Sequence, residues 1–399
     1  MSTLSLSDRA MELSASDQSP PPPPPCNPPL YTFVRPWPEF NDGLSYTDLI
    51  KCSTSVLTLI DFYASNYKNS APIEGWLHRI RNGQIAVDGK VVKDPDFILR
   101  KGSKVVYHRL PWKEPSAPYL LDVLYEDDDI VVINKPSGLQ VLPGGLFQQR
   151  TILTQLQWRE WRVTTSYPPC TKQKASQAHP VPVHRLGRGT SGLLLCAKTK
   201  IAKVRLASYF AEKTANAESN RFESEFCNTR QISKFYRGLV TGIIDDDEVI
   251  ITQPIGLVKY PGVAQGLYVA SSTGKSAMSK VHVLERDMQR NQTLVQVEIQ
   301  SGRPHQIRIH LSYIGHPLLG DPLYCDGGVS KICTTDCSNG SFAEDGGYEK
   351  PVQPVPGDCG YNLHAHWLVL CHPTSSERIT LVAPLPSLLQ TQAERSRAL

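Results

Sequence analysis

The sequence predicts an α+β fold built around a mixed, mostly antiparallel sheet, with a small basic domain ahead of it. Beyond residue 124, strand-like segments follow one another without the regularly spaced helices that a doubly wound parallel sheet needs. Segment 293–299 alternates apolar and polar side chains, which is typical of a strand with one buried face. Hydrophobic residues make up 40% of the chain and charged residues 20%, as in ordinary folded proteins.

Bulk properties restrict the function without identifying it. The chain has 399 residues, enough for two or three domains with a substantial core. Its net charge of +4 is too small to indicate a nucleic-acid partner by itself, so any basic surface must be local. No apolar run approaches the roughly 20 residues of a membrane-spanning helix, and no signal-peptide pattern opens the chain. We therefore expect a soluble intracellular protein without a membrane partner, favouring cytoplasm or nucleus and leaving organelle import open.

The ten cysteines are scattered, which favours reduced thiols over a disulfide framework. No Cys-x-x-Cys pair is present, so we expect no metal site. A regulatory zinc site stays open as a remote alternative, because several potential ligands lie near one another in the sequence: Cys325, Cys333, Cys337, Cys359, His364 and His366.

Ahead of the main sheet, the sequence predicts a disordered leader and a small domain. Residues 1–30 are rich in serine and then proline, a composition typical of disordered or polyproline segments. Residues 50–110 contain a helix-like segment, a hairpin around Asp88-Gly89 and a closing strand. Its basic side chains fit either a solvated face or an RNA-binding module: Arg79, Arg81, Lys90 and Lys104. The proline-containing stretch 109–118 is expected to be a linker.

The larger domain is expected to span residues 120–390. Its predicted strands are 130–134, 193–197, 233–242, 293–299, 363–370 and 378–382, with a turn at 135–138. Its predicted helical segments are 201–210 and 302–315, and Pro304 suits the first helical position of the second. Residues 326–360 are rich in Gly, Asp, Ser and Pro and are predicted to form an insertion loop.

The segment 183–192, with sequence VHRLGRGTSG, is the strongest local signal. It combines a histidine, two arginines, three glycines and two hydroxyls, and an apolar run follows it. Glycines let the backbone approach a ligand closely, and arginine is suited to phosphate. The segment is therefore either a phosphodiester cradle or a glycine-rich turn with two surface arginines. It contains no carboxylate.

Two other segments carry candidate side chains. The predicted helix places His305, Arg308 and Ser312 on one face, which favours a polar groove lining over a metal site. Tyr236 lies on a predicted strand, where a tyrosine is usually core but can also stack on a base. Lys135 ends a buried strand and is a weak signal alone.

The order of these motifs resembles the RluA-type RNA pseudouridine synthases. From residue 125 to 385 the chain shows Asn-Lys-Pro-x-Gly-Leu, His-Arg-Leu-x-x-x-Thr-Ser-Gly, Lys-x-Tyr, Gly-Arg-x-His-Gln-Ile-Arg, Gly-Asp-x-Leu-Tyr and Leu-His-Ala. Residues 57–108 resemble a small RNA-binding module of ribosomal-protein type. The resemblance implies a central, mostly antiparallel sheet with a cleft, and isomerisation of uridine to pseudouridine in tRNA or rRNA. It implies structured, uridine-containing RNA as partner, a flipped target base, no DNA partner and no cofactor.

The resemblance also implies site residues. The family tyrosine falls on Tyr236 and the family arginine on Arg303, whereas the family aspartate falls on Gly187. Glycine offers no atom for nucleophilic attack or proton transfer. RNA-contacting roles are implied for Lys135, His184, Arg185, Arg188, Thr190, Ser191, His305 and Arg308.

Three outcomes follow from the missing aspartate. Another carboxylate can serve, with Asp321 of the Gly-Asp-Pro-Leu-Tyr segment as the candidate. The chain can instead be a catalytically silent relative that binds RNA. Third, it can act slowly by positioning alone.

Overall fold

The computed structural model describes residues 26, 28–51, 56–68, 70–164, 179–218, 232–260, 263–324, 326–328, 347 and 359–397. The expected leader over 1–30 and the expected insertion loop over 326–360 lie mostly outside these residues, as do Cys325, Cys333 and Cys337. Within the described parts of the chain, no helix is long and apolar enough to cross a membrane.

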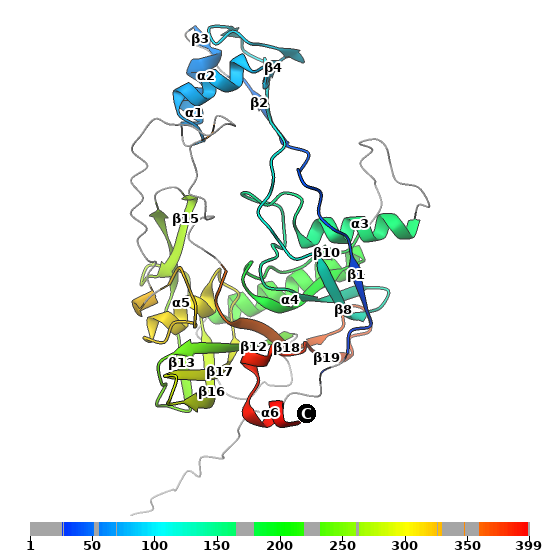
Figure 1. Ribbon diagram of the computed structural model, residues 1–399, viewed down its shortest axis with the longest axis vertical. Helices are drawn as coiled ribbons and strands as arrows, with labels where there is room; N and C mark the ends of the chain where they lie inside the picture. Colours follow the sequence, from blue (N-terminus) through cyan, green and yellow to red (C-terminus); the bar gives the residue numbers. More distant parts are fainter. Residues whose placement is uncertain are drawn as a thin grey trace, which may run out of the picture.

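One large sheet organises the molecule, as expected for this α+β fold (Figure 1). Its strands pair antiparallel throughout, with β11 and β18 as the one parallel pair among the described residues. The order along the sheet is β1 (Tyr31–Val34), β8 (Leu120–Glu126), β9 (Ile130–Lys135), β11 (Ser191–Ala197), β18 (Leu363–Cys371), β12 (Ile232–Thr241), β17 (Gln292–Ile299), β16 (Ser279–Asp287) and β13 (Glu248–Ile251). At the sides, β10 (Val181–Pro182) pairs with β11 and β19 (Arg378–Val382) pairs with β18.

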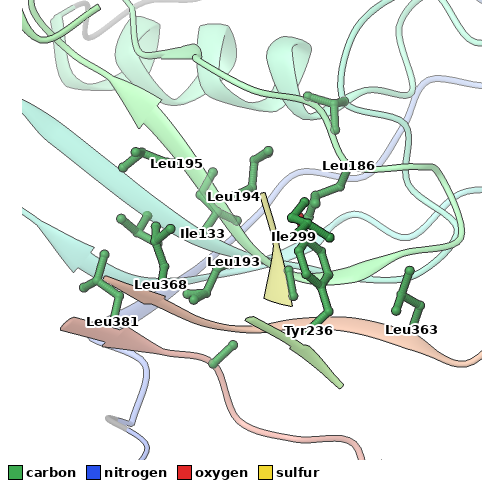
Figure 2. Packing of buried hydrophobic residues seen from close by; sticks show 14 of the residues in the cluster. Ile133, Leu186, Leu193, Leu194, Leu195, Tyr236, Ile299, Leu363, Leu368 and Leu381 are labelled. Atoms are coloured by element: carbon green, nitrogen blue, oxygen red, sulfur yellow. The ribbon is translucent and has the colours of Figure 1, made fainter. Parts of the chain in front are cut away.

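The central strands are buried on both faces, which explains their continuous apolar runs. Leu193, Leu194 and Leu195 of β11 are at most 3% exposed, and Ile133 of the neighbouring β9 is fully buried. Figure 2 shows these side chains packed together with residues of β12, β18 and β19. Burial of each leucine contributes about 1.5–3 kcal/mol. Helices α3 (Ile152–Thr164) and α4 (Lys200–Glu218) lie beside these strands (Figure 1).

Gly192 allows the parallel contact between β11 and β18. Ser191 pairs with His364 and Gly192 with Ala365. Gly192 has a φ of +101°, and a Cβ at this position would lie 2.2 Å from the Ala365 carbonyl oxygen. Only glycine fits so close an approach in this conformation. The Ser-Gly pair of the motif therefore sets the register at the centre of the sheet.

The small module has its own sheet and its own core (Figure 1, dark blue to cyan). Its strands follow the order β2 (Leu44–Leu49), β7 (Lys104–Arg109), β4 (Ile85–Val87) and β5 (Lys90–Val91), while β3 (Leu57–Thr58) pairs with β6 (Ile98–Leu99). Helices α1 (Leu59–Asn66) and α2 (Ile73–Arg81) pack beside them. The expected Asp-Gly hairpin is present, because Asp88 and Gly89 both have positive φ between β4 and β5.

The stretch expected to be a linker is instead anchored. Glu114 is 3% exposed, and its carboxylate accepts hydrogen bonds from the Asn41 side chain and from the backbone N–H groups of residues 148–150. A buried carboxylate with this many donors holds its segment firmly. The proline pattern at 109–118 predicted an irregular backbone, but it did not reveal this anchor.

Helix α5 (Gln306–Tyr313) begins later than predicted. His305 is in the left-handed conformation, with φ of 56°, so Pro304 does not enter the first helical turn. The Gln306 side chain explains the turn, because its oxygen accepts hydrogen bonds from Ser301 Oγ and the Arg303 N–H. Beside α5 lie η1 (Asp326–Gly328) and the hairpin of β14 (Ile255–Tyr260) and β15 (Val263–Ala270).

The fold also continues past the expected end at residue 390. Two short helices follow, η2 (Ser387–Leu389) and α6 (Gln392–Arg397). The buried Arg237 of β12 donates two hydrogen bonds of 3.0 Å to the Glu394 carboxylate. The last helix thereby supplies the counter-ion of a strand at the centre of the sheet.

Candidate functional site

The glycine- and arginine-rich segment opens directly into β11, at the point where β11 meets β18. Ser191 Oγ lies 2.8 Å from His364 Nδ1. Burial, together with the nearby His366 and Arg237, lowers the pKa of His364 to about 3. The imidazole is therefore neutral, and its hydrogen bond links the Thr-Ser-Gly segment to the Leu-His-Ala segment.

The space beside Gly187 is filled by the hydroxyl of Tyr361. A Cβ built at residue 187 would lie 2.7 Å from Tyr361 Oη and 3.3 Å from Thr190 Oγ1. The two hydroxyls also lie within hydrogen-bonding distance of each other, at 3.1 Å. Tyr361 is 4% exposed. A phenolic oxygen therefore lies in the space that an aspartate side chain at residue 187 would need.

Arg308 and Asp321 form a buried ion pair next to Tyr361. Arg308 Nε and Nη2 donate to the two carboxylate oxygens of Asp321, each over 2.8 Å. The guanidinium lies over the Tyr361 ring, 4.2 Å from its centroid, and 5.0 Å from that of Tyr324. Arg308 Nη1 is buried and has no hydrogen-bond partner among the described residues.

The environment keeps Asp321 ionised but fully engaged. Burial alone would raise the pKa of Asp321, yet the hydrogen bonds from Arg308 and from two backbone N–H groups lower it. Its side chain is 1% exposed. In this conformation Asp321 orients Arg308, and the expectation that it offers a free substitute carboxylate finds no support in these contacts.

Arg308 contacts the ring of Tyr361, the tyrosine whose hydroxyl lies beside Gly187. Arg303 Nε donates to the Ser276 carbonyl at 3.0 Å. Arg308 was expected to contact RNA, but it is 2% exposed and lies between two tyrosine rings. The sequence spacing correctly put both arginines near one helix start.

Tyr236 lies on the strand that faces this region. It pairs with Ala365 of β18, the same residue that Gly192 approaches from the other side. Burial raises the pKa of the Tyr236 phenol well above its usual range. Figure 2 shows Tyr236 in one cluster with Leu186, which directly precedes Gly187. Tyr236 and the residue before Gly187 therefore belong to the same buried cluster.

A buried lysine near Tyr236 was not among the expected site residues. Lys234 is 9% exposed, and its Nζ lies 4.9 Å from the Phe210 ring centroid and 3.7 Å from a Cβ built at Gly302. Burial lowers the pKa of its ammonium to about 8. Within the described residues no carboxylate forms an ion pair with it. Such a cation is suited to an anionic ligand.

Two residues expected to contact RNA instead hold the backbone. Lys135 is fully buried, and its Nζ donates to the carbonyls of Pro136 and Arg188 over 2.9 Å. His184 Nε2 accepts a hydrogen bond from the Leu195 N–H. Burial, followed by the charge of Lys234, lowers the pKa of His184 to about 3, which leaves this nitrogen unprotonated.

The remaining expected residues divide between exposed and structural positions. Arg185 is exposed, and Arg188 is half-buried with its guanidinium 4.9 Å from the Phe147 ring centroid. Thr190 is buried against Tyr361. His305 Nδ1 lies 2.7 Å from Tyr324 Oη. Since the Tyr324 hydroxyl donates its proton to the Tyr268 carbonyl, His305 Nδ1 must be the donor of that bond.

The sequence analysis did not identify Tyr361, because this residue belongs to none of the recognised motifs. It follows the expected insertion loop and lies two residues before Leu363 of the Leu-His-Ala segment. Lys234 had a signal, since it belongs to the Lys-x-Tyr motif. Its burial without a counter-ion depends on α4 and the residue 302 turn, which no local pattern predicts.

Comparisons with known proteins identify the family of the chain. The family described as RNA pseudouridylate synthase matches residues 129–313. A protein named RNA pseudouridine synthase 5 from Oryza sativa subsp. japonica is 64% identical over 390 residues, covering 97% of this chain and 96% of the relative. A protein of the same name from Arabidopsis thaliana is 60% identical over 372 residues, which cover 92% of this chain and 100% of the relative. Ribosomal large subunit pseudouridine synthase D of Pseudomonas aeruginosa is 31% identical over 319 residues, which cover 79% of this chain and 83% of the relative. The matches confirm the resemblance of the ordered motifs: the chain belongs to the RluA-type RNA pseudouridylate synthase family.

Proposed function

We propose that this chain isomerises a uridine of a structured RNA to pseudouridine at the site formed by the Gly187 segment, Tyr236 and Arg308. The observation that carries the proposal is their convergence on one point of the sheet. Gly192 and Tyr236 flank the same residue of β18, and Tyr361 joins Arg308 to Gly187. Homologues at 60–64% identity that are named pseudouridine synthases support catalysis over a silent relative.

Each side chain has a proposed part. The target base leaves its helix and stacks near Tyr236, since aromatic stacking stabilises a flipped base by about 1–3 kcal/mol. Arg185 and Arg188 contact phosphates at the mouth of the segment. Lys234 offers its buried ammonium to an anionic group of the substrate. Lys135 and His184 do not contact the substrate, and their hydrogen bonds hold the backbone of the loop in place.

The small module is proposed to bind RNA outside the reacting nucleotide. Arg81, Lys90 and Lys104 are exposed, which leaves their charges accessible to phosphates. Arg79 is different, because it is 4% exposed and its guanidinium lies 4.6 Å from the Trp76 ring centroid. Replacing the three exposed residues by glutamine should weaken RNA binding and reduce its salt dependence. Arg79→Gln should instead destabilise the module.

Purified full-length protein, incubated with unmodified tRNA and large-subunit rRNA transcripts, tests the activity. The rRNA arm is included because a relative is named a ribosomal large subunit pseudouridine synthase. We expect pseudouridine at a defined position, no product from DNA of the same sequence, and an unchanged rate in EDTA. Tyr236→Phe should lower kcat, while the exposed Tyr313→Phe should not.

The alternative function is RNA binding without chemistry. Its outcome is tight, salt-dependent binding of the same transcripts with no pseudouridine after long incubation. That result would overturn the proposed activity.

Localisation is proposed to be cytoplasmic or nuclear. Imaging of a C-terminally tagged chain that includes residues 1–30 tests this.

A further inference from the structure

We propose that Tyr361 supplies the nucleophilic oxygen for this reaction, in the place left open by Gly187. The proposal rests on the proposed isomerase function. It rests on position first: Tyr361 Oη lies 2.7 Å from where a Cβ at residue 187 would be, about the distance at which a side-chain oxygen of an aspartate would lie. No other described side-chain oxygen comes as close to that position; Thr190 Oγ1 follows at 3.3 Å.

The surroundings of Tyr361 suit an oxygen that becomes negatively charged. The Arg308 guanidinium covers the ring at 4.2 Å, and its Nη1 is a buried donor without a hydrogen-bond partner in the described structure. A buried donor of this kind is available to an acceptor that the substrate brings. Behind Arg308 stands Asp321, which holds the guanidinium by two hydrogen bonds of 2.8 Å. Arg308 and Asp321 are positioning residues in this scheme.

Tyrosine oxygen is chemically competent for the step. Some glycoside hydrolases use a tyrosine as nucleophile at the sugar's anomeric carbon. Here the phenol first loses its proton to solvent. The phenolate oxygen then bonds to C1′ as the N1–C1′ bond breaks, and its electron pair stays on uracil. The uracil anion turns, its C5 bonds to C1′ and the phenolate leaves, after which the C5 proton moves to N1. Tyrosine is regenerated and the net change is an isomerisation.

The alternative is that Tyr361 only fills the space beside a glycine. Tyr361→Phe separates the two readings, because it keeps the ring under Arg308 and removes the oxygen alone. With the RNA that the wild-type chain modifies, we expect kcat to fall at least 100-fold while the dissociation constant for RNA changes less than 2-fold. Tyr313→Phe, on the exposed face of α5, is the matched control and should keep kcat.

Restoring a carboxylate gives a second, independent measurement. Gly187→Asp alone brings a Cβ to 2.7 Å from the phenolic oxygen and should be inactive or poorly folded. In Gly187→Asp/Tyr361→Phe that oxygen is gone, and the next ring atom, Cζ, is 4.0 Å away. We expect this double variant to regain at least 10-fold in kcat over Tyr361→Phe.

The pH profile distinguishes a nucleophile from a spacer. A phenol ionises at higher pH than a carboxyl group, so the wild-type rate should still rise with pH where the double variant has already levelled off. Among the described residues, the charged groups next to Tyr361 are Arg308 and, held by it, Asp321. A Tyr361→Phe variant that keeps more than a hundredth of wild-type kcat would overturn the proposal. A wild type without product would overturn the isomerase function and this inference together, whereas an active wild type with an active Tyr361→Phe rejects the inference alone.

Discussion

Arg308 and Asp321 are joined by two hydrogen bonds of 2.8 Å inside the protein, with side chains that are 2% and 1% exposed. Their pairing turns a carboxylate expected to act on the substrate into one that orients an arginine. The Asp321 oxygens also accept hydrogen bonds from the N–H groups of Leu323 and Tyr324. The ion pair therefore couples the start of α5 to the segment that follows it.

Asp321→Asn should destabilise the protein by about 3–5 kcal/mol, because it leaves the buried Arg308 charge without its partner. Chemical denaturation of the purified variant measures the change. Asp247→Asn is the control, since the Asp247 side chain pairs with Arg286 but is 89% exposed, and its loss should cost about 0.5 kcal/mol or less. A folded Asp321→Asn protein with unchanged stability would contradict the structural role assigned to this pair.

Gly192→Ala should be among the most destabilising single changes in the main sheet. The new Cβ would meet the Ala365 carbonyl at 2.2 Å in a backbone conformation with φ of +101°. We expect a loss of about 4 kcal/mol or more, or no soluble protein. Gly315→Ala separates the cost of backbone strain from the cost of a steric clash. Gly315 also has a positive φ, of +84°, but a Cβ built there has no atom within 4 Å. It should cost only about 1–2 kcal/mol.

Lys234→Met should stabilise the free protein at pH 7. Burial lowers the pKa of Lys234 to about 8 from 10.5, so the folded state holds the proton more weakly than the unfolded state. The resulting penalty is fully present below pH 8 and disappears as pH rises from 8 to 10.5. The gain at pH 7 should be at most about 3 kcal/mol and should vanish near pH 10.5. Denaturation at several pH values measures it, with the exposed Lys203→Met as control.

The same variant should bind RNA more weakly, because an anionic group of the substrate loses its buried cation. A Lys234→Met protein with wild-type affinity and kcat would remove Lys234 from the proposed site.

Buried histidines should make the fold sensitive to acid. Burial lowers the pKa values of His184 and His364 to about 3, and those of His310 and His366 to about 4, from 6.5. Between pH 6.5 and 4 these histidines are protonated in the unfolded chain but not in the folded chain. The free energy of unfolding therefore falls as pH drops from 6.5 towards 4. His310→Gln should flatten this dependence, whereas the exposed His108→Gln should not. Melting temperatures from pH 4 to 8 measure both.

Local sequence patterns predicted much of the fold because their causes are local. The Asp-Gly turn at Asp88 and the alternation of segment 293–299 are both present in the structure as expected. The start of α5 was misplaced, because the Gln306 side chain overrides the preference of Pro304 for a first helical turn. The anchor at Glu114 was missed for a similar reason, since its donors come from residue 41 and residues 148–150.

The sequence by itself determined the class of sheet and the family, because ordered motifs and apolar runs are properties of a linear chain. It also showed that residue 187 lacks the expected carboxylate. Only the tertiary structure decided what stands in its place. Tyr361 and Thr190 are 171 residues apart in the chain, and the parallel pairing of β11 with β18 brings their hydroxyls to 3.1 Å. A contact of this kind depends on strand order and backbone approach, which side-chain periodicity does not encode.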